Sequence, residues 1–389
     1  LLFHNKSFLC QLISGRDTFL IKGYQSKDLF CDREKELEQL SRNVMNGIDT
    51  TLISPRRMGK TGLIFRFFDH LRETGEIKSV YVDIFSSRNL DEFIKLMAEA
   101  ILLEFPEQTP IGSQFMNFIK GFRPLIGFDA LSGQPQIQIN YQSAQEKEYT
   151  LQSLFSFLDS RNQTIVMAID EFQQVSNYPE KNMEALLRSY IQKLTNVRFI
   201  FCGSQRNLMI NIFSNTKRPF YASTQFLFLD KINSDSYAAF IWEKFEKSGT
   251  AISDDALAMV LDWSRRHTFY TQSLCNMLYY SAENEITTET VKQAALELLT
   301  QNEPVFFQYR QLLTSIQWNF LIAIAKEGEV KQLTAQKFIS KYKIGTPANA
   351  RRISKSLLEK ELILETSSKE GTSYRVYDVF LSRWLEKEY

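Results

Sequence analysis

Short apolar segments alternate with longer amphipathic segments over much of the chain. The apolar segments have the length and composition of strands and cover residues 50–54, 79–85, 164–170, 197–203 and 225–230. The amphipathic segments have helical spacing and cover residues 60–74, 89–104, 148–160 and 181–194. Strands that are apolar throughout and alternate with helices are typical of a parallel sheet covered on both faces. The pattern therefore predicts an α/β domain over residues 30–230.

A further helix is expected before the first strand. In "CDREKELEQLSRNVMNG", Leu37, Leu40 and Val44 recur at helical spacing, and Asp32 is a suitable N-cap. Residues 1 to about 22 carry no clear pattern, and residues 1–29 are treated as an N-terminal extension. Because there is no initiator Met, we interpret the chain as a fragment or as one with a misassigned start.

One segment interrupts the alternation of strands and helices. "RPLIGFDALSGQPQIQINY", residues 123–141, contains two β-like runs around a Ser-Gly-Gln-Pro turn. This composition is typical of a β-hairpin. We expect the hairpin as an insertion before the third strand of the sheet.

Strand-like segments stop after residue 230. Four amphipathic segments follow, with Ser234, Ser253 and Thr287 as N-cap candidates. They predict a small helical domain over residues 231–303. Pro304 is expected to break the chain between this domain and the next.

Residues 304–389 show a different order of elements. A helix over residues 311–326 is followed by two more helical segments. Two strands around a polar turn come next, in "LILETSSKEGTSYRVYDV", and then a final helix. Three helices followed by a β-hairpin is the order of a winged-helix domain.

Composition limits the kinds of partner. The 46 Lys and Arg residues nearly balance 45 Asp and Glu residues, so a net charge of +1 provides no global attraction to nucleic acid or membranes. No apolar run reaches the roughly 18 residues that a membrane helix needs, so no membrane partner is expected. The cysteines lack CxxC spacing and are interpreted as buried thiols rather than zinc ligands or disulfides, which favours a cytoplasmic location.

The segment between the first strand and the next helix is close to a phosphate-binding loop. The pattern G-x-x-x-x-G-K-[ST] surrounds phosphates with backbone N–H groups and requires a strand before it and a helix after it. Lys60 is expected to contact β- and γ-phosphate oxygens, and the Thr61 hydroxyl to bind Mg²⁺. The predicted nucleotide-binding residues of the loop are Ser54, Pro55, Arg56, Arg57, Met58, Gly59, Lys60, Thr61 and Gly62.

Ser54 departs from this pattern, because a glycine usually opens the loop. Gly59 must let the chain approach a phosphate closely, whereas position 54 mainly ends the strand. A serine with negative φ therefore serves at position 54. The alternative interpretation is a basic turn before a helix, with no bound nucleotide.

Two carboxylates follow the third predicted strand. In "TIVMAIDEFQQV" the apolar run ends in Asp170 and Glu171. The carboxyl ends of parallel strands meet at the crevice where such sheets bind ligands. We expect Asp170 to hold Mg²⁺ through its hydration shell and Glu171 to polarise the attacking water. The alternative is an ordinary acidic pair at a helix entry.

The next strand ends in small polar residues, in "VRFIFCGSQRNLM". Ser204 or Gln205 would contact a γ-phosphate or position the attacking water. A polar loop after a core strand is the alternative. Three strand ends with complementary groups together favour a working nucleotide site.

Several segments together resemble the archaeal-type ATPase family, a STAND-like branch of the AAA+-related P-loop NTPases. The segments that carry the resemblance are "FCDREKEL", "LISPRRMGKTGLI", "VMAIDEFQQV", "FIFCGSQRNLM", "RPFY" and "YTQSLCNMLYY". It covers about residues 25–389 and implies an α/β P-loop NTPase core of the AAA+/ASCE type, followed by a helical lid and a winged-helix domain. The sensor strand would lie between the loop strand and the Walker B strand. The preference for ATP over GTP rests on this resemblance.

The resemblance also implies roles outside the loop. Phe30, Asp32 and Arg33 would lie near the adenine, in the segment before the first core helix. Arg218 in "KRPFY" falls where related ATPases carry an arginine finger, and a plain basic loop is the alternative. In related proteins an arginine from a neighbouring subunit often completes the site, which implies a nucleotide-dependent oligomer.

We interpret the chain as a slow, Mg²⁺-dependent ATPase that acts as a switch, in which ATP and ADP position the lid and winged helix differently. A DNA-binding regulator is the first alternative, because Arg351, Arg352 and Lys355 lie on one helix of the predicted winged helix. A solvated helix face would also explain these charges. An inactive nucleotide-binding scaffold for an unidentified protein partner is the second alternative.

Overall fold

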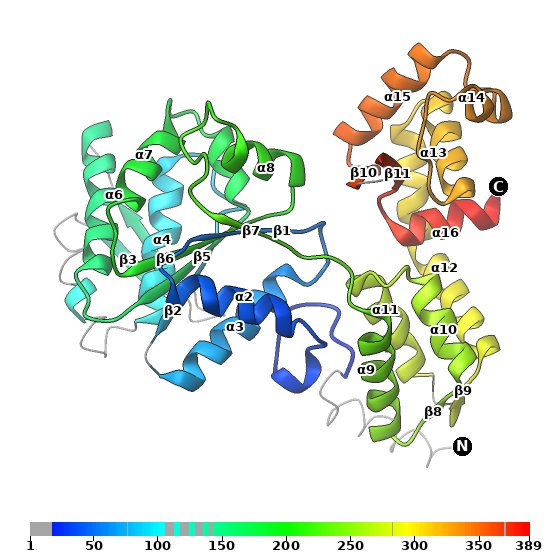
Figure 1. Cartoon of the computed structure of the whole chain (residues 1–389), viewed down its shortest axis with the longest axis horizontal. Helices are drawn as coiled ribbons and strands as arrows, with labels where there is room; N and C mark the ends of the chain where they lie inside the picture. Colours follow the sequence, from blue (N-terminus) through cyan, green and yellow to red (C-terminus); the bar gives the residue numbers. More distant parts are fainter. Residues whose placement is uncertain are drawn as a thin grey trace. The chain divides into compact units, whose positions relative to one another are not determined.

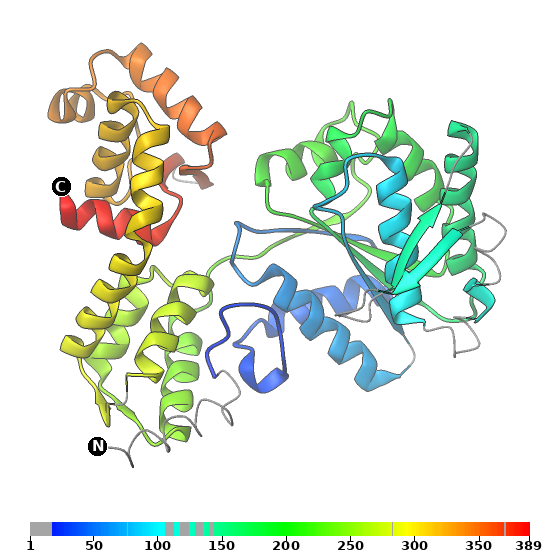
Figure 2. The same ribbon diagram turned by 180° about the vertical axis from the view of Figure 1, so that it is seen from behind.

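The computed structural model of the chain describes residues 18–75, 77–105, 113–116, 124–128, 135–139, 143–281, 283–368 and 371–389. The chain forms two compact units, residues 23–231 and residues 232–389, and the described residues before Gly23 belong to the second unit. Figures 1 and 2 show the elements of each unit from opposite sides. Among the described helices, none is long and apolar enough to cross a membrane.

The first unit, called the α/β unit, is built on a parallel sheet. Within the described residues the sheet has five strands in the order β2-β5-β6-β1-β7, and all neighbours are parallel. In chain order the strands are β1 (Thr50–Ile53), β2 (Lys78–Asp83), β5 (Ile165–Asp170), β6 (Val197–Gly203) and β7 (Gln225–Phe228). The parallel sheet is confirmed, and so is the expected position of β6 between β1 and β5.

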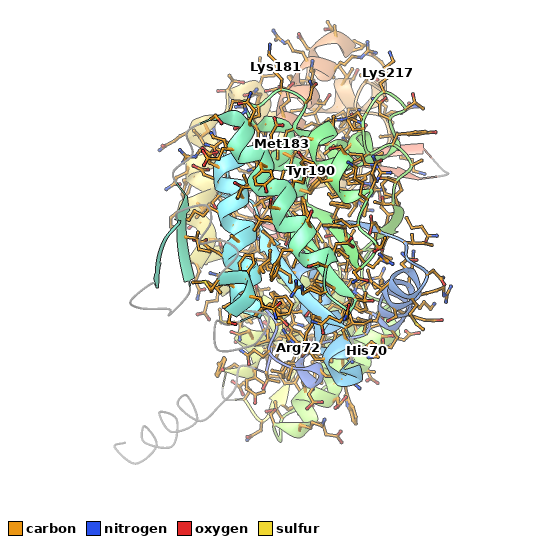
Figure 3. All side chains as sticks on the ribbon, turned by 90° about the vertical axis from the view of Figure 1, so that its left-hand side faces the viewer. His70, Arg72, Lys181, Met183, Tyr190 and Lys217 are labelled. Carbon is orange, nitrogen blue, oxygen red and sulfur yellow. The ribbon has the colours of Figure 1, made fainter. Side chains whose placement is uncertain are left out.

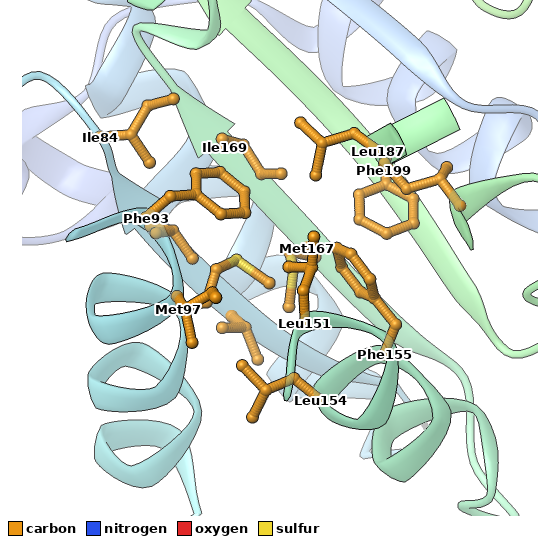
Figure 4. Packing of buried hydrophobic residues seen from close by; sticks show 14 of the residues in the cluster. Ile84, Phe93, Met97, Leu151, Leu154, Phe155, Met167, Ile169, Leu187 and Phe199 are labelled. Atoms are coloured by element: carbon orange, nitrogen blue, oxygen red, sulfur yellow. The ribbon is translucent and has the colours of Figure 1, made fainter. Parts of the chain in front are cut away.

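Helices cover both faces of this sheet (Figure 1). Alternate residues of β5 face opposite cores, as the pleat of a strand requires. Val166 and Ala168 pack in the core formed with the helices that follow residues 33 and 59. Met167 and Ile169 pack in the core on the other face, where Figure 4 shows Phe93 and other side chains against them. Because both faces are buried, β5 is apolar up to its last residue.

The helices of the α/β unit, with η marking 3₁₀ turns, are η1 (Lys27–Leu29), α2 (Glu34–Met45), α3 (Lys60–Thr74), α4 (Leu90–Glu104), α6 (Ala144–Asp159), η2 (Phe172–Asn177), α7 (Met183–Ile191) and α8 (Arg206–Ser214). The predicted helix over residues 60–74 matches α3 in full. Helix α6 begins four residues earlier than the predicted start at residue 148, because the Ser143 side chain accepts a hydrogen bond from the Glu146 N–H and caps it there.

The predicted hairpin has two paired strands, β3 (Pro124–Phe128) and β4 (Pro135–Ile139), which run antiparallel. The turn between them lies outside the described residues. The backbone N–H of Ile137 donates to the Glu99 carboxylate of α4 at 2.7 Å, and the Ile137 side chain is buried. The hairpin is therefore attached to α4 and forms a sheet separate from the parallel one.

The helix before β1 begins at Glu34, and Arg33 rather than Asp32 is its N-cap residue. Asp32 and Arg33 have φ values of 59° and 80°, both in the left-handed region. This turn directs the Arg33 guanidinium to the backbone oxygen of Asp230 at 2.6 Å and to Glu36 at 2.9 Å. The predicted N-cap at Asp32 is wrong, because the long-range contact of Arg33 determines how the chain enters the helix.

The second unit, called the helical unit, begins with α9 (Ser234–Lys247), β8 (Ala251–Ile252), α10 (Asp254–Trp263), α11 (Thr268–Tyr279), β9 (Glu285–Ile286) and α12 (Thr288–Leu312). Ser253 and Thr287 cap α10 and α12 as predicted. The predicted N-cap at Ser234 is wrong by one position. Asn233 caps α9, since its side chain accepts hydrogen bonds from the N–H groups two and three residues further on.

Phe19 lies in the core of the helical unit. Its side chain is 1% exposed, and its ring lies 5.2 Å from Phe245 and 5.9 Å from Tyr279 between centroids. The side chain of Asn276 donates to the Phe19 backbone oxygen at 3.2 Å. A residue that precedes the α/β unit in sequence is therefore part of the helical unit, which the sequence pattern does not indicate.

The winged helix occupies the end of the helical unit, and its order of elements is confirmed. The elements are α13 (Ser315–Glu327), α14 (Gln336–Tyr342), α15 (Pro347–Glu359), β10 (Ile363–Ser368), β11 (Gly371–Val376) and α16 (Val379–Glu388). Strands β10 and β11 are antiparallel. Ile353 and Leu357 of α15 are buried, as expected, and Arg351, Arg352 and Lys355 are exposed.

The predicted break at Pro304 is wrong, since α12 continues through this residue. Trp384 of α16 packs on both sides of the proline. Its indole N–H donates to the Glu303 carboxylate at 3.0 Å, and its ring lies 5.4 Å from that of Phe306. These tertiary contacts offset the backbone hydrogen bond that a proline removes.

Helix α16 also returns to the turn between α10 and α11. The Arg265 guanidinium lies 2.7 Å from the Glu386 carboxylate, and Arg383 donates to the Trp263 backbone oxygen at 3.0 Å. The Phe380 ring of α16 packs against Trp263 of α10 and Tyr270 of α11. The predicted lid and winged helix are thus joined by one continuous helix and by direct contacts within a single unit.

Candidate functional site

The carboxyl ends of β1, β5 and β6 lie side by side. Ile53, the last residue of β1, is in register with Gly203, the last residue of β6. Ile169 of β5 is in register with Phe201 of β6. Parallel register therefore brings the segments after these strands together at one edge of the sheet, the usual position of ligands in α/β proteins.

The loop after β1 ends in a glycine with a left-handed backbone conformation. Gly59 has a φ of 89° and is the N-cap residue of α3. Ser54 is 1% exposed, its φ is negative, and its hydroxyl donates to the backbone oxygen of Pro55 at 3.0 Å. The serine therefore ends the strand without strain. Of the other loop residues, Met58 is buried, and Arg56 and Arg57 are exposed.

Lys60 points back to the carboxylates at the end of β5. Its ammonium lies 2.7 Å from Oδ1 of Asp170 and 3.1 Å from Oε1 of Glu171. Burial lowers the pKa of Lys60, but the two carboxylates outweigh this effect and the pKa is raised. The lysine is therefore a buried cation held by two anions, at the position where the loop pattern places the phosphate-binding lysine.

Asp170 accepts hydrogen bonds from two hydroxyl groups. The Thr61 hydroxyl donates to its Oδ2 at 3.1 Å, and the Tyr81 hydroxyl of β2 donates to the same oxygen at 2.9 Å. Burial and the Asp170 charge raise the pKa of Tyr81, so this hydroxyl keeps its proton and remains a donor. Tyr81 was not predicted as a site residue. The sequence feature that could have indicated it is a tyrosine within the apolar strand β2, which pairs with β5.

Glu171 follows the strand in a left-handed conformation, with a φ of 55°. Its Oε2 accepts a hydrogen bond from the Ser204 hydroxyl at 2.8 Å and another from the Gln173 side-chain amide. Ser204 therefore contacts Glu171 directly, and Gln205 is the N-cap residue of α8. Gln173, a polar residue two positions after Glu171 that is 3% exposed, was also not predicted from the sequence.

Thr61 and Asp170 suit a hard divalent cation. A hydroxyl oxygen and a carboxylate oxygen lie 3.1 Å apart at the start of α3. Mg²⁺ in phosphate-transfer proteins is held by one or two protein oxygens, with waters and substrate phosphates completing its coordination. The residues present therefore fit the Mg²⁺ that the loop pattern implies.

The segment before α2 packs against the first turn of α3. A Cβ atom added at Gly62 would lie 3.4 Å from Cε2 of Phe30, and the Tyr24 ring lies 5.8 Å from the Phe30 ring. Phe30 is thus next to the loop. Asp32 is partly exposed, and the buried Arg33 is engaged by the backbone of Asp230.

Arg218 has partners on α7, α8 and η2. Its guanidinium forms an ion pair with Glu184 and donates to Asn211 at 3.0 Å and to Ser176 at 2.9 Å. Figure 3 shows this side of the α/β unit, with Met183 on α7 and Lys217 beside α8. The structure therefore connects Arg218 to three surface elements rather than to the loop residues.

Comparison with known families decides the classification. Residues 30–264 match a family described as an ATPase domain predominantly from Archaea. The chain belongs to this ATPase family. Residues 304–387 of the chain match a second family described as a probable winged helix domain. No curated protein is significantly similar to the chain in sequence.

Solved structures share the fold of this chain. A Walker-type ATPase of Pyrococcus abyssi has a TM-score of 0.64 at 17% identity, over 95% of this chain and 99% of that one. The ORC2 protein of Aeropyrum pernix has a TM-score of 0.59 at 15% identity, over 96% of each chain. The ORC1 protein of Aeropyrum pernix, solved in complex with DNA, has a TM-score of 0.53 at 14% identity, over 96% of this chain and 97% of that one. At these identities the likeness concerns the fold alone.

Proposed function

We propose that the chain binds ATP with Mg²⁺ at the carboxyl ends of β1, β5 and β6 and hydrolyses it to ADP and phosphate. One observation carries this proposal. The buried Lys60, at the start of α3, meets two consecutive carboxylates: Asp170, the last residue of β5, and Glu171, which follows it. Family membership supports the same activity.

The loop residues and Lys60 bind the phosphates in this proposal. Backbone N–H groups at the start of α3 face an anion favourably because of the helix dipole. Lys60 leaves Asp170 and Glu171 and pairs with β- and γ-phosphate oxygens. Thr61 and Asp170 would hold Mg²⁺, which supplies positive charge to the phosphate oxygens when bound. Phe30 offers apolar ring surface to the adenine, and Asp32 and Arg33 shape the chain beside it.

Glu171 is the general base of the proposed reaction. The oxygen of a water molecule forms a bond to the γ-phosphorus, and the bond from this phosphorus to the β–γ bridging oxygen breaks. A proton of the water passes to the Glu171 carboxylate and then to the released phosphate. Ser204 donates a hydrogen bond to Glu171 and thereby holds this carboxylate at the strand end.

The contacts of Arg218 favour its structural interpretation over the arginine finger. A finger role would require the guanidinium to leave Glu184, Asn211 and Ser176. Breaking a partly buried charge pair costs free energy that a phosphate contact must replace. We therefore propose that Arg218 acts as an arginine finger only if it is first released from Glu184.

We further propose that the nucleotide state of the α/β unit controls the placement of the helical unit. Continuous helix α12 and the α16 contacts at Arg265 and Arg383 support movement of the lid and winged helix as one body. A ligand shifts such an equilibrium only through different affinity for its two states. Hydrogen exchange should therefore differ between the ATP-analogue and ADP complexes in the segment that joins the units, and identical exchange would contradict the switch.

Mg²⁺-dependent ATP binding and phosphate release test the proposed activity, with Lys60→Ala and Glu171→Gln beside the wild type. We expect Lys60→Ala to lose nucleotide affinity, because a neutral side chain replaces the phosphate-binding cation. We expect Glu171→Gln to bind ATP and to release little phosphate, because an amide is no general base. A wild-type chain that binds no nucleotide would refute the proposal, and an unchanged rate in Glu171→Gln would refute the role of Glu171.

DNA binding by the winged helix is a second candidate function, favoured by a local charge pattern. Between residues 331 and 360 the sequence has eight Lys and Arg residues and a single Glu. Arg351, Arg352 and Lys355 of this group are exposed on α15, whose first residue is Pro347. A basic helix face attracts DNA phosphates even when the whole protein is nearly neutral.

A further inference from the structure

Gln173 is almost fully enclosed beside the candidate general base. Its side chain is 3% exposed, and its amide nitrogen donates to Oε2 of Glu171. Its amide oxygen is buried and has no hydrogen-bond partner among the described residues. A buried amide oxygen without a hydrogen-bond partner costs free energy of folding. Packing alone therefore does not explain a glutamine at this position.

Gly203, at the end of β6, leaves the space that this amide occupies. A Cβ atom at Gly203 would lie 2.4 Å from the Gln173 amide oxygen and 2.5 Å from Cγ of Met209. Both distances are shorter than carbon atoms tolerate. The φ of Gly203 is negative, so the glycine is needed for space rather than for backbone conformation. The unsatisfied amide oxygen therefore lies at the end of β6, beside Glu171 and Ser204.

In the proposed nucleotide complex, Glu171 loses one of its three hydrogen-bond donors. The Glu171 carboxylate accepts hydrogen bonds from Lys60, Ser204 and the Gln173 amide. When Lys60 pairs with phosphates, the two neutral donors are left to orient the carboxylate. Side chains that hold a catalytic group within a fraction of an ångström contribute to rate without contributing to substrate affinity.

We infer that Gln173 is a positioning residue that orients the Glu171 carboxylate for water activation, and that Gly203 is required to admit it. This inference rests on the proposed ATPase activity. The buried amide oxygen of Gln173 lies against Gly203, and the amide nitrogen makes the contact with Glu171. Gln173 thus acts through Glu171 and not as a base itself.

Gln173→Met separates this role from simple packing, because methionine keeps the length and volume of glutamine and lacks the donor. We expect kcat for ATP to fall about 10- to 100-fold, less than the loss expected for a missing general base, and KM to stay within about 3-fold. Gln174→Met is the matched control. Gln174 lies next in sequence, but its amide donates to the Phe85 backbone oxygen, so the wild-type kcat is expected.

Gly203→Ala provides a second variant that keeps the glutamine but displaces its amide, and it should lower kcat in the same selective way. Thermal unfolding of all variants identifies changes that act through stability. A folded Gln173→Met chain with wild-type kcat would overturn the inference, as would equal losses in kcat and in nucleotide affinity. If wild type and Glu171→Gln release phosphate at the same rate, the proposed role of Glu171 falls first, and the role of Gln173 falls with it.

Discussion

The ammonium group of Lys60 lies 2.7 Å from Oδ1 of Asp170, and both side chains are more than nine-tenths buried. The lysine predicted to bind phosphate is thus paired with the carboxylate predicted to hold Mg²⁺. In the proposed nucleotide complex, Lys60 exchanges this ion pair for contacts with phosphate. The pair also contributes to the stability of the fold, because a buried charge without a partner is costly.

Lys60→Ala is expected to destabilise the nucleotide-free protein by about 3 to 5 kcal/mol, because it leaves buried carboxylates without their cation. Urea unfolding at neutral pH measures this loss. Lys292→Ala is the control, since Lys292 forms an exposed ion pair with Glu289 at 3.3 Å and such pairs contribute little. Equal unfolding midpoints for Lys60→Ala and the control would show that the Lys60 pair does not stabilise the fold.

Asp49 should make stability depend on pH. Burial raises the pKa of Asp49 to about 6, although it accepts a hydrogen bond from the Phe199 N–H and lies near Arg198. The folded state then holds the proton more tightly than the unfolded chain does. The stabilisation from Asp49 is complete below pH about 4 and is lost as the pH rises through about 6.

Asp49→Asn should remove this dependence, since asparagine keeps the acceptor oxygen and carries no charge. At pH 7 to 8 the variant should be more stable than the wild type, by up to about 3 kcal/mol. The difference should disappear near pH 4. Urea unfolding at several pH values measures both curves, and a difference that is constant with pH would contradict the interpretation.

Arg218 and Glu184 are expected to act as one structural unit. Replacing either by Ala should destabilise the α/β unit, because the partner is left without its charge pair. The double variant should lose less than the sum of the two single losses, with a coupling free energy of about 1 to 3 kcal/mol. Unfolding of the four proteins gives this value. If the losses of unfolding free energy in the two single variants add up in the double variant, and Arg218→Ala alone lowers the ATPase rate, the arginine finger is favoured instead.

Duplex DNA binding should depend on the basic face of α15. Arg351→Ala/Arg352→Ala should weaken binding and reduce the slope of log affinity against log salt by about 2, roughly one unit for each lost phosphate contact. Lys95→Ala in the α/β unit is the control. A titration monitored by fluorescence anisotropy at several salt concentrations gives the slope. Wild-type binding that is absent or independent of salt would rule out this function.

The sequence by itself determined the features that depend on local patterns. Apolar strands and helical spacing predicted the parallel sheet and the helix Lys60–Thr74. The loop and the carboxylates Asp170 and Glu171 were also predicted, because they lie at the carboxyl ends of apolar strands. Parallel strands carry their carboxyl ends to one edge, so residues distant in sequence were expected to meet there. Their grouping in the structure agrees with that expectation.

Only the tertiary structure decided the contacts that local patterns leave open. The left-handed turn at Asp32 depends on the distant backbone oxygen of Asp230, and the continuation of α12 through Pro304 depends on Trp384. Tyr81 and Gln173 reach the site through their neighbours in space and not through a motif. Propensity and periodicity report the preferences of nearby residues, whereas burial and long-range hydrogen bonds outweigh those preferences by a few kcal/mol where strands and helices pack.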